Sequence, residues 1–356
     1  MAGVLVGMSG GVDSAAAALL LRAQGCEVYG ASLLLHPYGR CGEDTAAARA
    51  AAEAIGIPFS AVSGEALFRA RVMRPFADGY AAGETPNPCV FCNPGAKFPL
   101  LLREADRLSL PLVATGHYAR IRHEGGRHFL AVAADRAKDQ TYVLWALPQE
   151  TLARLVLPMG ELTKREARSL ARSHGLSCAE RAESQDICFI PDGDYPSFLR
   201  REMGVCSPEG DFISPEGAVL GRHRGQIGYT IGQRRGLGLS AAQRLFVLAR
   251  DPVRNTVTLG APELLYSGRI AVRSCNWQAI GPPQGSLRVF VKARYSQPPQ
   301  PAVLTPTGES AAVLSFLSPQ RALTPGQSAV FYDGDAMLGG GILTAAPSDE
   351  TEKEKE

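Results

Sequence analysis

The stretch from Val6 to Gly25, VGMSGGVDSAAAALLLRAQG, constrains the fold of this chain more than any other. It contains the end of an apolar run, a glycine-rich turn, and an alanine- and leucine-rich segment with the pattern of a helix. The glycines allow several backbone N–H groups to converge, and the N-terminus of the following helix adds a partial positive charge. This arrangement favours a bound phosphate group; the alternative is a glycine-rich turn that only packs.

Two common phosphate motifs are missing from this turn. A Walker loop has a lysine after its last glycine, whereas Val12 follows Gly11 here. The G-x-G-x-x-G pattern of dinucleotide-binding folds is not met either. The sequence therefore disfavours ordinary P-loop nucleotide hydrolysis.

Short apolar runs alternate with helical patterns in the first part of the chain, which predicts an α/β domain with a parallel sheet. We expect this domain at 1–203, a small arginine- and glycine-rich middle domain at 204–266 and a C-terminal β-barrel at 267–346. The tail at 347–356 is acidic, and we expect it to be disordered. The predicted strands are 4–8, 27–35 and 112–115, and the predicted helices are 14–24, 44–55, 97–108 and 163–174.

The net charge of +2 conceals an uneven distribution. Six arginines and no acidic residue lie between Gly217 and Arg250, a density that favours a polyanionic partner over a merely solvated face. The chain shows neither a signal peptide pattern nor a long apolar run, so we expect a cytoplasmic protein that does not associate with membranes.

Cysteines form the second informative pattern. Cys89 and Cys92 make a C-x-x-C in the proline-rich stretch GETPNPCVFCN, and Cys188 lies in SQDICFIP. By itself a C-x-x-C serves zinc, a redox pair or neither, and no second ligand pair of the usual spacing completes a zinc site. For Cys188, residue type alone leaves a buried, inert thiol as an alternative.

The stretch SGGVDS resembles the pyrophosphate-binding loop of the ATP pyrophosphatases, the PP-loop superfamily, which transfer AMP to a substrate oxygen. Eight stretches, in order, resemble bacterial tRNA-specific 2-thiouridylases, which replace the C2 oxygen of the wobble uridine by sulfur. They are GMSGGVDS, TPNPCVFCN, ATGHYAR, KDQTYVLW, SQDICFI, GQRRGLG, VKARYSQ and TPGQSAVFYDGD. The resemblance implies an adenine-nucleotide-hydrolase-like catalytic domain, ATP and Mg²⁺, a tRNA with a wobble uridine, and a sulfur-donor protein such as a persulfide carrier or a cysteine desulfurase relay.

The same resemblance implies roles for individual residues. Cys188 would accept sulfur as a persulfide, and Cys92 would release it through a transient disulfide with Cys188. The implied nucleotide-binding residues, with Asp13 near magnesium, are Gly7, Met8, Ser9, Gly10, Gly11, Val12, Asp13, Ser14, Leu33 and Gly116. The implied tRNA-binding residues are Asn87, Pro88, Cys89, His117, Lys138, Asp139, Gln140, Arg294, Tyr295 and Gln327.

Cys89 departs from the family pattern, because many members have an aspartate at this position. Three cysteines, Cys89, Cys92 and Cys188, then resemble the ligand set of related tRNA thiolases that hold a 4Fe-4S cluster, so a cluster route competes with the persulfide route. Two rival functions are also open: a different PP-loop enzyme, such as a tRNA lysidine synthetase or an amidotransferase-type synthetase, and a non-catalytic RNA-binding iron-sulfur protein.

Overall fold

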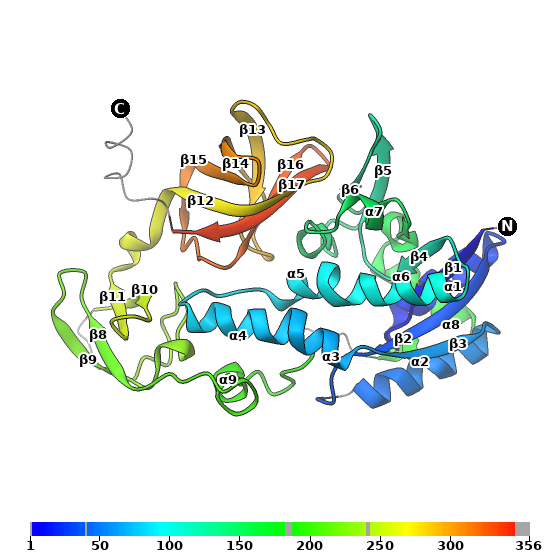
Figure 1. Cartoon of the computed structure of the whole chain (residues 1–356), viewed down its shortest axis with the longest axis horizontal. Helices are drawn as coiled ribbons and strands as arrows, with labels where there is room; N and C mark the ends of the chain where they lie inside the picture. The colour runs from blue at the N-terminus through cyan, green and yellow to red at the C-terminus, as the bar shows by residue number, and fades with distance from the viewer. Residues whose placement is uncertain (1, 40, 182–186, 240–242, 346–356) are drawn as a thin grey trace.

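Three β-sheets organise the residues that the computed structural model describes, which are 2–39, 41–181, 187–239 and 243–345 (Figure 1). The first sheet belongs to the α/β part, the second to the middle segment and the third to the C-terminal barrel. The predicted acidic tail at 347–356 lies outside the described residues. The predicted fold class is confirmed.

The first sheet is parallel and has the strand order β3-β2-β1-β4-β7. Alternate residues of β1 enter different cores: Val4 and Val6 pack with helices α1, α2 and α8, whereas Leu5 packs with α6. Helices therefore cover both faces of the sheet, as the alternating pattern predicts. The bounds are β1 Gly3–Gly7, α1 Val12–Ala23, β2 Glu27–Leu34, α2 Cys41–Ile55, β3 Phe59–Ser63, α6 Phe98–Arg107, β4 Leu112–Thr115, β7 Leu155–Val156 and α8 Lys164–Ser173.

The order of the strands reverses between β1 and β4. From β1 the chain moves outward to β2 and β3, and it then returns to the other side of β1 through β4 and β7. In open parallel sheets, ligands bind at the carboxyl ends of the strands at such a point. The glycine-rich turn follows β1 and Gly116 follows β4, so both predicted nucleotide segments meet there.

Shorter elements connect this core to the rest of the chain. Helix α4 leads to α5, which contains the cysteine pair, and the β5–β6 hairpin stands beside the barrel (Figure 1). The pairing of Ala131 with Ala336 adds this hairpin to the barrel sheet. The bounds are α3 Glu65–Phe68, α4 Arg74–Ala81, α5 Pro88–Cys92, β5 Arg120–Glu124, β6 Arg127–Ala131, α7 Gln149–Leu152 and α9 Tyr195–Met203.

The middle sheet has the order β10-β11-β8-β9 around a small core that includes Phe212 and Val247. The C-terminal strands β12 to β17 form a closed barrel, because β12 pairs with β17 as well as with β15. Its core includes Leu314 and Phe331. The bounds are β8 Gly210–Ile213, β9 Val219–His223, β10 Phe246–Asp251, β11 Thr256–Gly260, β12 Tyr266–Trp277, β13 Leu287–Lys292, β14 Gln300–Gly308, β15 Ala311–Arg321, β16 Ser328–Asp333 and β17 Ala336–Thr344.

Among the described helices, none combines the length and the apolar character that crossing a membrane requires.

Gln278, directly after β12, joins the barrel to the catalytic domain. Its side chain is fully buried. The Oε1 atom accepts a hydrogen bond from the Leu130 amide, and Nε2 donates to the carbonyls of Leu144 and Trp145 at 3.2 and 3.0 Å. Backbone groups of the catalytic domain therefore depend on a side chain from the barrel for their hydrogen bonds.

We expect Gln278→Leu to destabilise the protein by about 2–3 kcal/mol, because it leaves several buried backbone groups without partners. Chemical denaturation followed by far-UV circular dichroism measures this change. The matched control is Gln284→Leu, since Gln284 is exposed and donates only to Pro282. Equal stability of the two variants would contradict the role of Gln278.

Candidate active site

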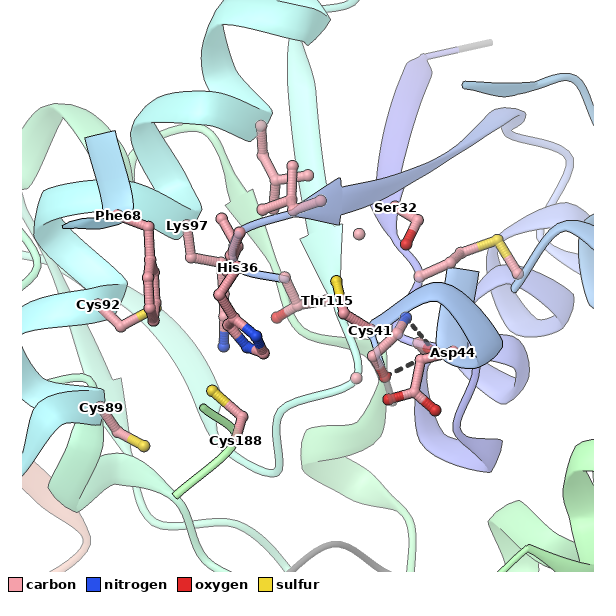
Figure 2. Close-up of a pocket in the computed structure, with 18 of the residues that line it drawn as sticks. Ser32, His36, Cys41, Asp44, Phe68, Cys89, Cys92, Lys97, Thr115 and Cys188 are labelled. Carbon is pink, nitrogen blue, oxygen red and sulfur yellow. Dashed lines mark hydrogen bonds between the residues drawn. The ribbon is translucent and has the colours of Figure 1, made fainter. Parts of the chain in front are cut away.

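A cavity of about 670 Å³ opens at the carboxyl ends of β1, β2 and β4 (Figure 2). Its two ends differ in chemistry. Ser32 and Asp44 lie at one end with the glycine-rich turn, and Cys89, Cys92 and Cys188 lie at the other (Figure 2). All three predicted catalytic cysteines, most of the predicted nucleotide-binding residues and several predicted tRNA-binding residues therefore face one cavity, whereas Gly10, Gly11 and Val12 do not line it. Those that line it are Gly7, Met8, Ser9, Asp13, Ser14, Leu33, Pro88, Cys89, Cys92, Gly116, His117, Gln140 and Cys188.

The glycine-rich turn has a geometry that only small residues permit. Gly10 has a φ of +74°, and a Cβ there would lie 2.4 Å from the carbonyl oxygen of Asp44. A Cβ on Gly116 would lie 2.6 Å from the Ser14 nitrogen, so the loop after β4 is held against the start of α1. The Ser14 hydroxyl accepts a hydrogen bond from the Ser9 amide at 3.2 Å and donates to the Gly11 carbonyl. Gly11 and Val12 form the start of α1.

Asp13 has two partners from elements far away in the sequence. Lys164 Nζ, on the first residue of α8, lies 2.8 and 2.7 Å from its two carboxylate oxygens. The Tyr118 hydroxyl donates to Oδ1 at 2.7 Å. This ion pair is partly buried, with 13% of the lysine and 30% of the aspartate side chain exposed. A cation and an anion thus stand together beside the predicted phosphate site.

A second cation holds the turn from the other side. Arg181 donates through Nη1 to the Gly10 carbonyl at 2.9 Å and through Nη2 to Asp44 Oδ1 at 2.7 Å. Lys164 and Arg181 follow β7, in the part of the chain that comes after the parallel strands. Positive charge therefore surrounds the turn without a lysine inside it, which suits a polyphosphate.

The cysteine end is built around the short helix α5. Asn87 caps it, because its side chain accepts a hydrogen bond from the Cys89 amide at 3.0 Å. Cys92 is buried and Cys89 and Cys188 have exposed surface, but all three line the cavity. Burial raises the pKa of Cys92 to about 11 and that of Cys188 to about 12, and it also raises the pKa of Cys89. Each of these thiols therefore holds its proton at neutral pH.

The charge of Lys97 opposes the effect of burial on the pKa of all three thiols. The Nζ atom of Lys97 lies 3.4 Å from Nε2 of His117. Burial and the charge of Lys97 hold the pKa of His117 well below its ordinary value, so the ring is neutral. Neutral His117 accepts from Lys97 at Nε2 and donates from Nδ1 to the Thr115 hydroxyl, 2.7 Å away.

The cysteines do not form a metal centre in this structure. Within the described parts of the chain, no group of three or more His, Cys, Asp or Glu side chains converges as a metal site would require. Cys89, Cys92 and Cys188 are suitable iron-sulfur ligands by chemistry, but in the described residues they do not form such a group. We therefore derive no step through a 4Fe-4S cluster. Residues 184–186 of the SQDICFI stretch lie outside the described residues.

Six of the predicted tRNA-binding residues lie outside the cysteine end of the cavity, and they differ in exposure. Some have partners inside the protein: Asp139 accepts from Thr141 and from the Ala133 amide, Gln140 from the Tyr118 amide, Arg294 donates to the Ala322 carbonyl, and Gln327 donates to the Thr85 carbonyl. Tyr295 contacts the Tyr142 ring and Lys292 and still leaves 46% of its surface exposed, and Lys138 is half-buried.

Several residues of the cavity region were not predicted from the sequence, among them Lys164, Lys97 and Cys41. Lys164 carried one usable signal, since a lysine at the first position of a helix opposes the helix dipole and needs another explanation. Lys97 was predicted only as the start of a helix. Cys41 lines the cavity because α2 begins three residues before its predicted start.

Comparisons with known proteins match three segments of the chain. Residues 2–192 match the family model described as a tRNA methyl transferase HUP domain, residues 196–261 a PRC-barrel domain and residues 267–343 an aminomethyltransferase β-barrel domain. The tRNA-specific 2-thiouridylase MnmA of Acidithiobacillus ferrooxidans is 43% identical, covering 95% of this chain and 97% of the relative. That of Chlorobium luteolum is 44% identical, covering 96% of each.

A solved structure of the U34-tRNA thiolase NcsA from Methanococcus maripaludis, with its 4Fe-4S cluster, is more distant. It is 18% identical, covers 56% of this chain and 67% of that chain, and has a TM-score of 0.36, too low to carry an argument about the cysteines.

The family models and the relatives differ in name, since the first model is called a methyl transferase domain and the relatives are thiouridylases. We follow the relatives, because their similarity extends over nearly the whole of both chains. The chain belongs to the tRNA-specific 2-thiouridylases, PP-loop enzymes that transfer sulfur to tRNA.

Proposed function

We propose that this enzyme uses ATP to adenylate the C2 oxygen of the wobble uridine and then replaces that oxygen by sulfur from a cysteine persulfide. A uracil carbonyl oxygen is a poor leaving group, and AMP makes it a good one. The observation that carries the proposal is the single cavity with a phosphate-binding turn at one end and Cys92 and Cys188 at the other. The target base would enter between these two ends.

At the nucleotide end, the backbone N–H groups of the turn and the hydroxyls of Ser9 and Ser14 would bind the phosphates. Lys164 would share its charge between Asp13 and a phosphate oxygen, since it already lies within 3 Å of the carboxylate. Asp13 is the residue of this turn that would hold Mg²⁺, which supplies charge neutralisation for the departing pyrophosphate. Leu33 and Gly116 would border the adenine.

At the cysteine end, a donor protein would place a sulfur atom on Cys188. The terminal sulfur of that persulfide attacks C2, and AMP leaves. The Cys92 thiolate then attacks Cys188 Sγ, so that the sulfur–sulfur bond to the substrate breaks and a Cys92–Cys188 disulfide forms. A dithiol reductant supplies the two electrons that restore both thiols. Cys92 must first lose its proton, and the Lys97 charge, with neutral His117 beside it, favours that loss.

For the tRNA, we propose contacts from the middle domain and the barrel. Arg222, Arg224, Arg234 and Arg235 are exposed, whereas Arg250 of the same segment is turned toward the protein. Tyr295 offers an exposed aromatic ring for stacking, and Lys138 adds charge. Asp139, Arg294 and Gln327 would support this surface from within. The boundaries at 203, 266 and 346 are proposed as the divisions between these functional parts.

The first prediction concerns the phosphate-binding turn. We expect Ser9→Ala and Asp13→Ala each to lower the rate of thiolation by about 10²-fold or more, because each removes a group aimed at the transferring phosphates. The affinity for tRNA should stay within twofold of the original value. Mass spectrometry of product nucleosides measures 2-thiouridine, and Asp78→Asn, which alters an exposed ion pair on α4, is the control. Normal thiolation in both turn variants would refute the assignment.

The second prediction separates the persulfide and cluster routes. We expect Cys92→Ser and Cys188→Ser to abolish thiolation, because each removes one half of the disulfide, and Cys89→Ser to remain active. Protein purified without oxygen should contain no stoichiometric iron. The control is Cys206→Ser, whose thiol is exposed outside the cavity.

A cluster would give the opposite pattern. Wild-type protein would then hold about four iron atoms per chain, and Cys89→Ser would lose both iron and activity. That result would overturn the persulfide route.

The third prediction concerns the exposed arginines of the middle domain. If each of the four binds a phosphate, the logarithm of tRNA affinity should fall with the logarithm of salt by about 0.7–0.9 per contact. Replacing Arg222, Arg224, Arg234 and Arg235 by alanine should flatten the slope by about 3. Fluorescence anisotropy across a salt series tests this, and an unchanged slope would show that the four arginines are only solvated.

A further inference from the structure

The segment Gly83–Pro88, here called the stem, connects α4 to α5 and ends one residue before Cys89. It contains two prolines, Pro86 and Pro88, which fix their own φ angles and restrict the residues before them. Asn87 between them caps α5 through the Cys89 amide. The stem can therefore bend little, and its position fixes the position of the two cysteines of α5.

The middle domain holds the stem through Arg250. Its Nη2 lies 2.8 Å from the carbonyl oxygens of both Gly83 and Glu84 and 3.0 Å from the Thr85 hydroxyl. The guanidinium stacks over the ring of Tyr80 on α4 at 5.6 Å. Burial lowers the pKa of Arg250, and its Nε and Nη1 atoms are buried without a hydrogen-bond partner. Three hydrogen bonds from this buried guanidinium therefore tie the middle domain to the stem.

The barrel holds the same stem from the other side. Arg273 of β12 lies 2.8 Å from both carboxylate oxygens of Glu84. The Thr85 amide donates to the Pro325 carbonyl at 2.9 Å, and Gln327 donates to the Thr85 carbonyl.

Close packing accompanies these hydrogen bonds. Gly326 has a φ of +88°, and a Cβ there would lie 2.7 Å from Glu84 Cβ and 2.8 Å from the Thr85 nitrogen. The barrel backbone therefore approaches the stem as closely as a glycine allows.

We propose that Arg250 and the Glu84–Arg273 pair are positioning residues for thiolation, which hold Cys89 and Cys92 at their place in the cavity. The middle domain and the barrel both contact the stem at Glu84 and Thr85. Only two prolines and an asparagine separate these two residues from Cys89. We call Arg250 and the Glu84–Arg273 pair the two clamps. Loss of either clamp would let α5 move relative to Cys188 and to the phosphate-binding turn. The inference rests on the proposed function of Cys92 and deepens it.

The test exchanges charges across the stem. We expect Glu84→Arg to lower kcat for thiolation at least tenfold, while the affinity for tRNA stays within twofold, because the variant affects the cysteines and not the arginine surface. The double variant Glu84→Arg with Arg273→Glu should recover activity to within threefold of wild type.

The other contact is tested at Arg250. Arg250→Met should lower kcat like Glu84→Arg, whereas Arg250→Lys should stay within threefold of wild type, since an ammonium can reach the same acceptors.

A second readout does not depend on thiolation. It is the rate at which iodoacetamide alkylates Cys92, measured by mass spectrometry on the full chain without ATP or tRNA. This rate should rise at least fivefold in Glu84→Arg and in Arg250→Met. In the double variant Glu84→Arg with Arg273→Glu it should return to the wild-type value. Arg254→Met is the matched control, because Arg254 pairs only locally with Asp251. Glu84→Gln replaces Glu84→Arg if the latter does not fold.

Unchanged Cys92 alkylation in the clamp variants would overturn the positioning role, whether or not their activity falls. Because alkylation needs no turnover, this result is separate from a failure of the persulfide route, which the cysteine variants test.

Discussion

The close approach of the loop after β4 to the first turn of α1 is the constraint on which the site depends. It requires Gly116, because any side chain there would collide with the backbone of Asp13 and Ser14. This contact closes the switch point of the sheet into a cavity and fixes the helix N-terminus toward it. Asp13 is thereby brought to Tyr118, two residues after Gly116, and from there to Lys164. The local geometry of one glycine thus determines where the charges of the nucleotide site stand.

The two ends of the cavity differ in their charge. The phosphate end needs stable positive charge, and Lys164 and Arg181 supply it while paired with Asp13 and Asp44. The cysteine end is poor in charge, so its thiols keep their protons until a partner changes their surroundings. A protonated thiol is a weak nucleophile and a weak metal ligand. The raised pKa values therefore keep these thiols in their less reactive form in the absence of substrate, and the charge of Lys97 favours the thiolate.

The sequence predicted the features that depend on local pattern. The strand, turn and helix of 4–24, the strand 112–115 and the barrel strands all have the periodicity of their elements, and the glycine-rich turn has a chemistry that few folds use. Features that depend on long-range approach could not be predicted. Lys164 reaches Asp13 across 151 residues and Arg181 reaches Gly10 across 171, and neither lies in a recognisable motif. The six arginines of the middle segment could not be told apart from the sequence. Arg250 nevertheless packs inside the protein, because the end of β10 lies against Tyr80.

The β5–β6 hairpin belongs to the catalytic domain by sequence and to the barrel by hydrogen bonding. A ribosome releases this hairpin long before the strand β17 that it joins, so the catalytic domain emerges with an unpaired sheet edge. The buried partners of Gln278 must likewise wait for the C-terminal part of the chain. Completion of the N-terminal domain is therefore tied to the end of synthesis, and a truncated chain that stops before the barrel would carry open edges that other chains could pair with.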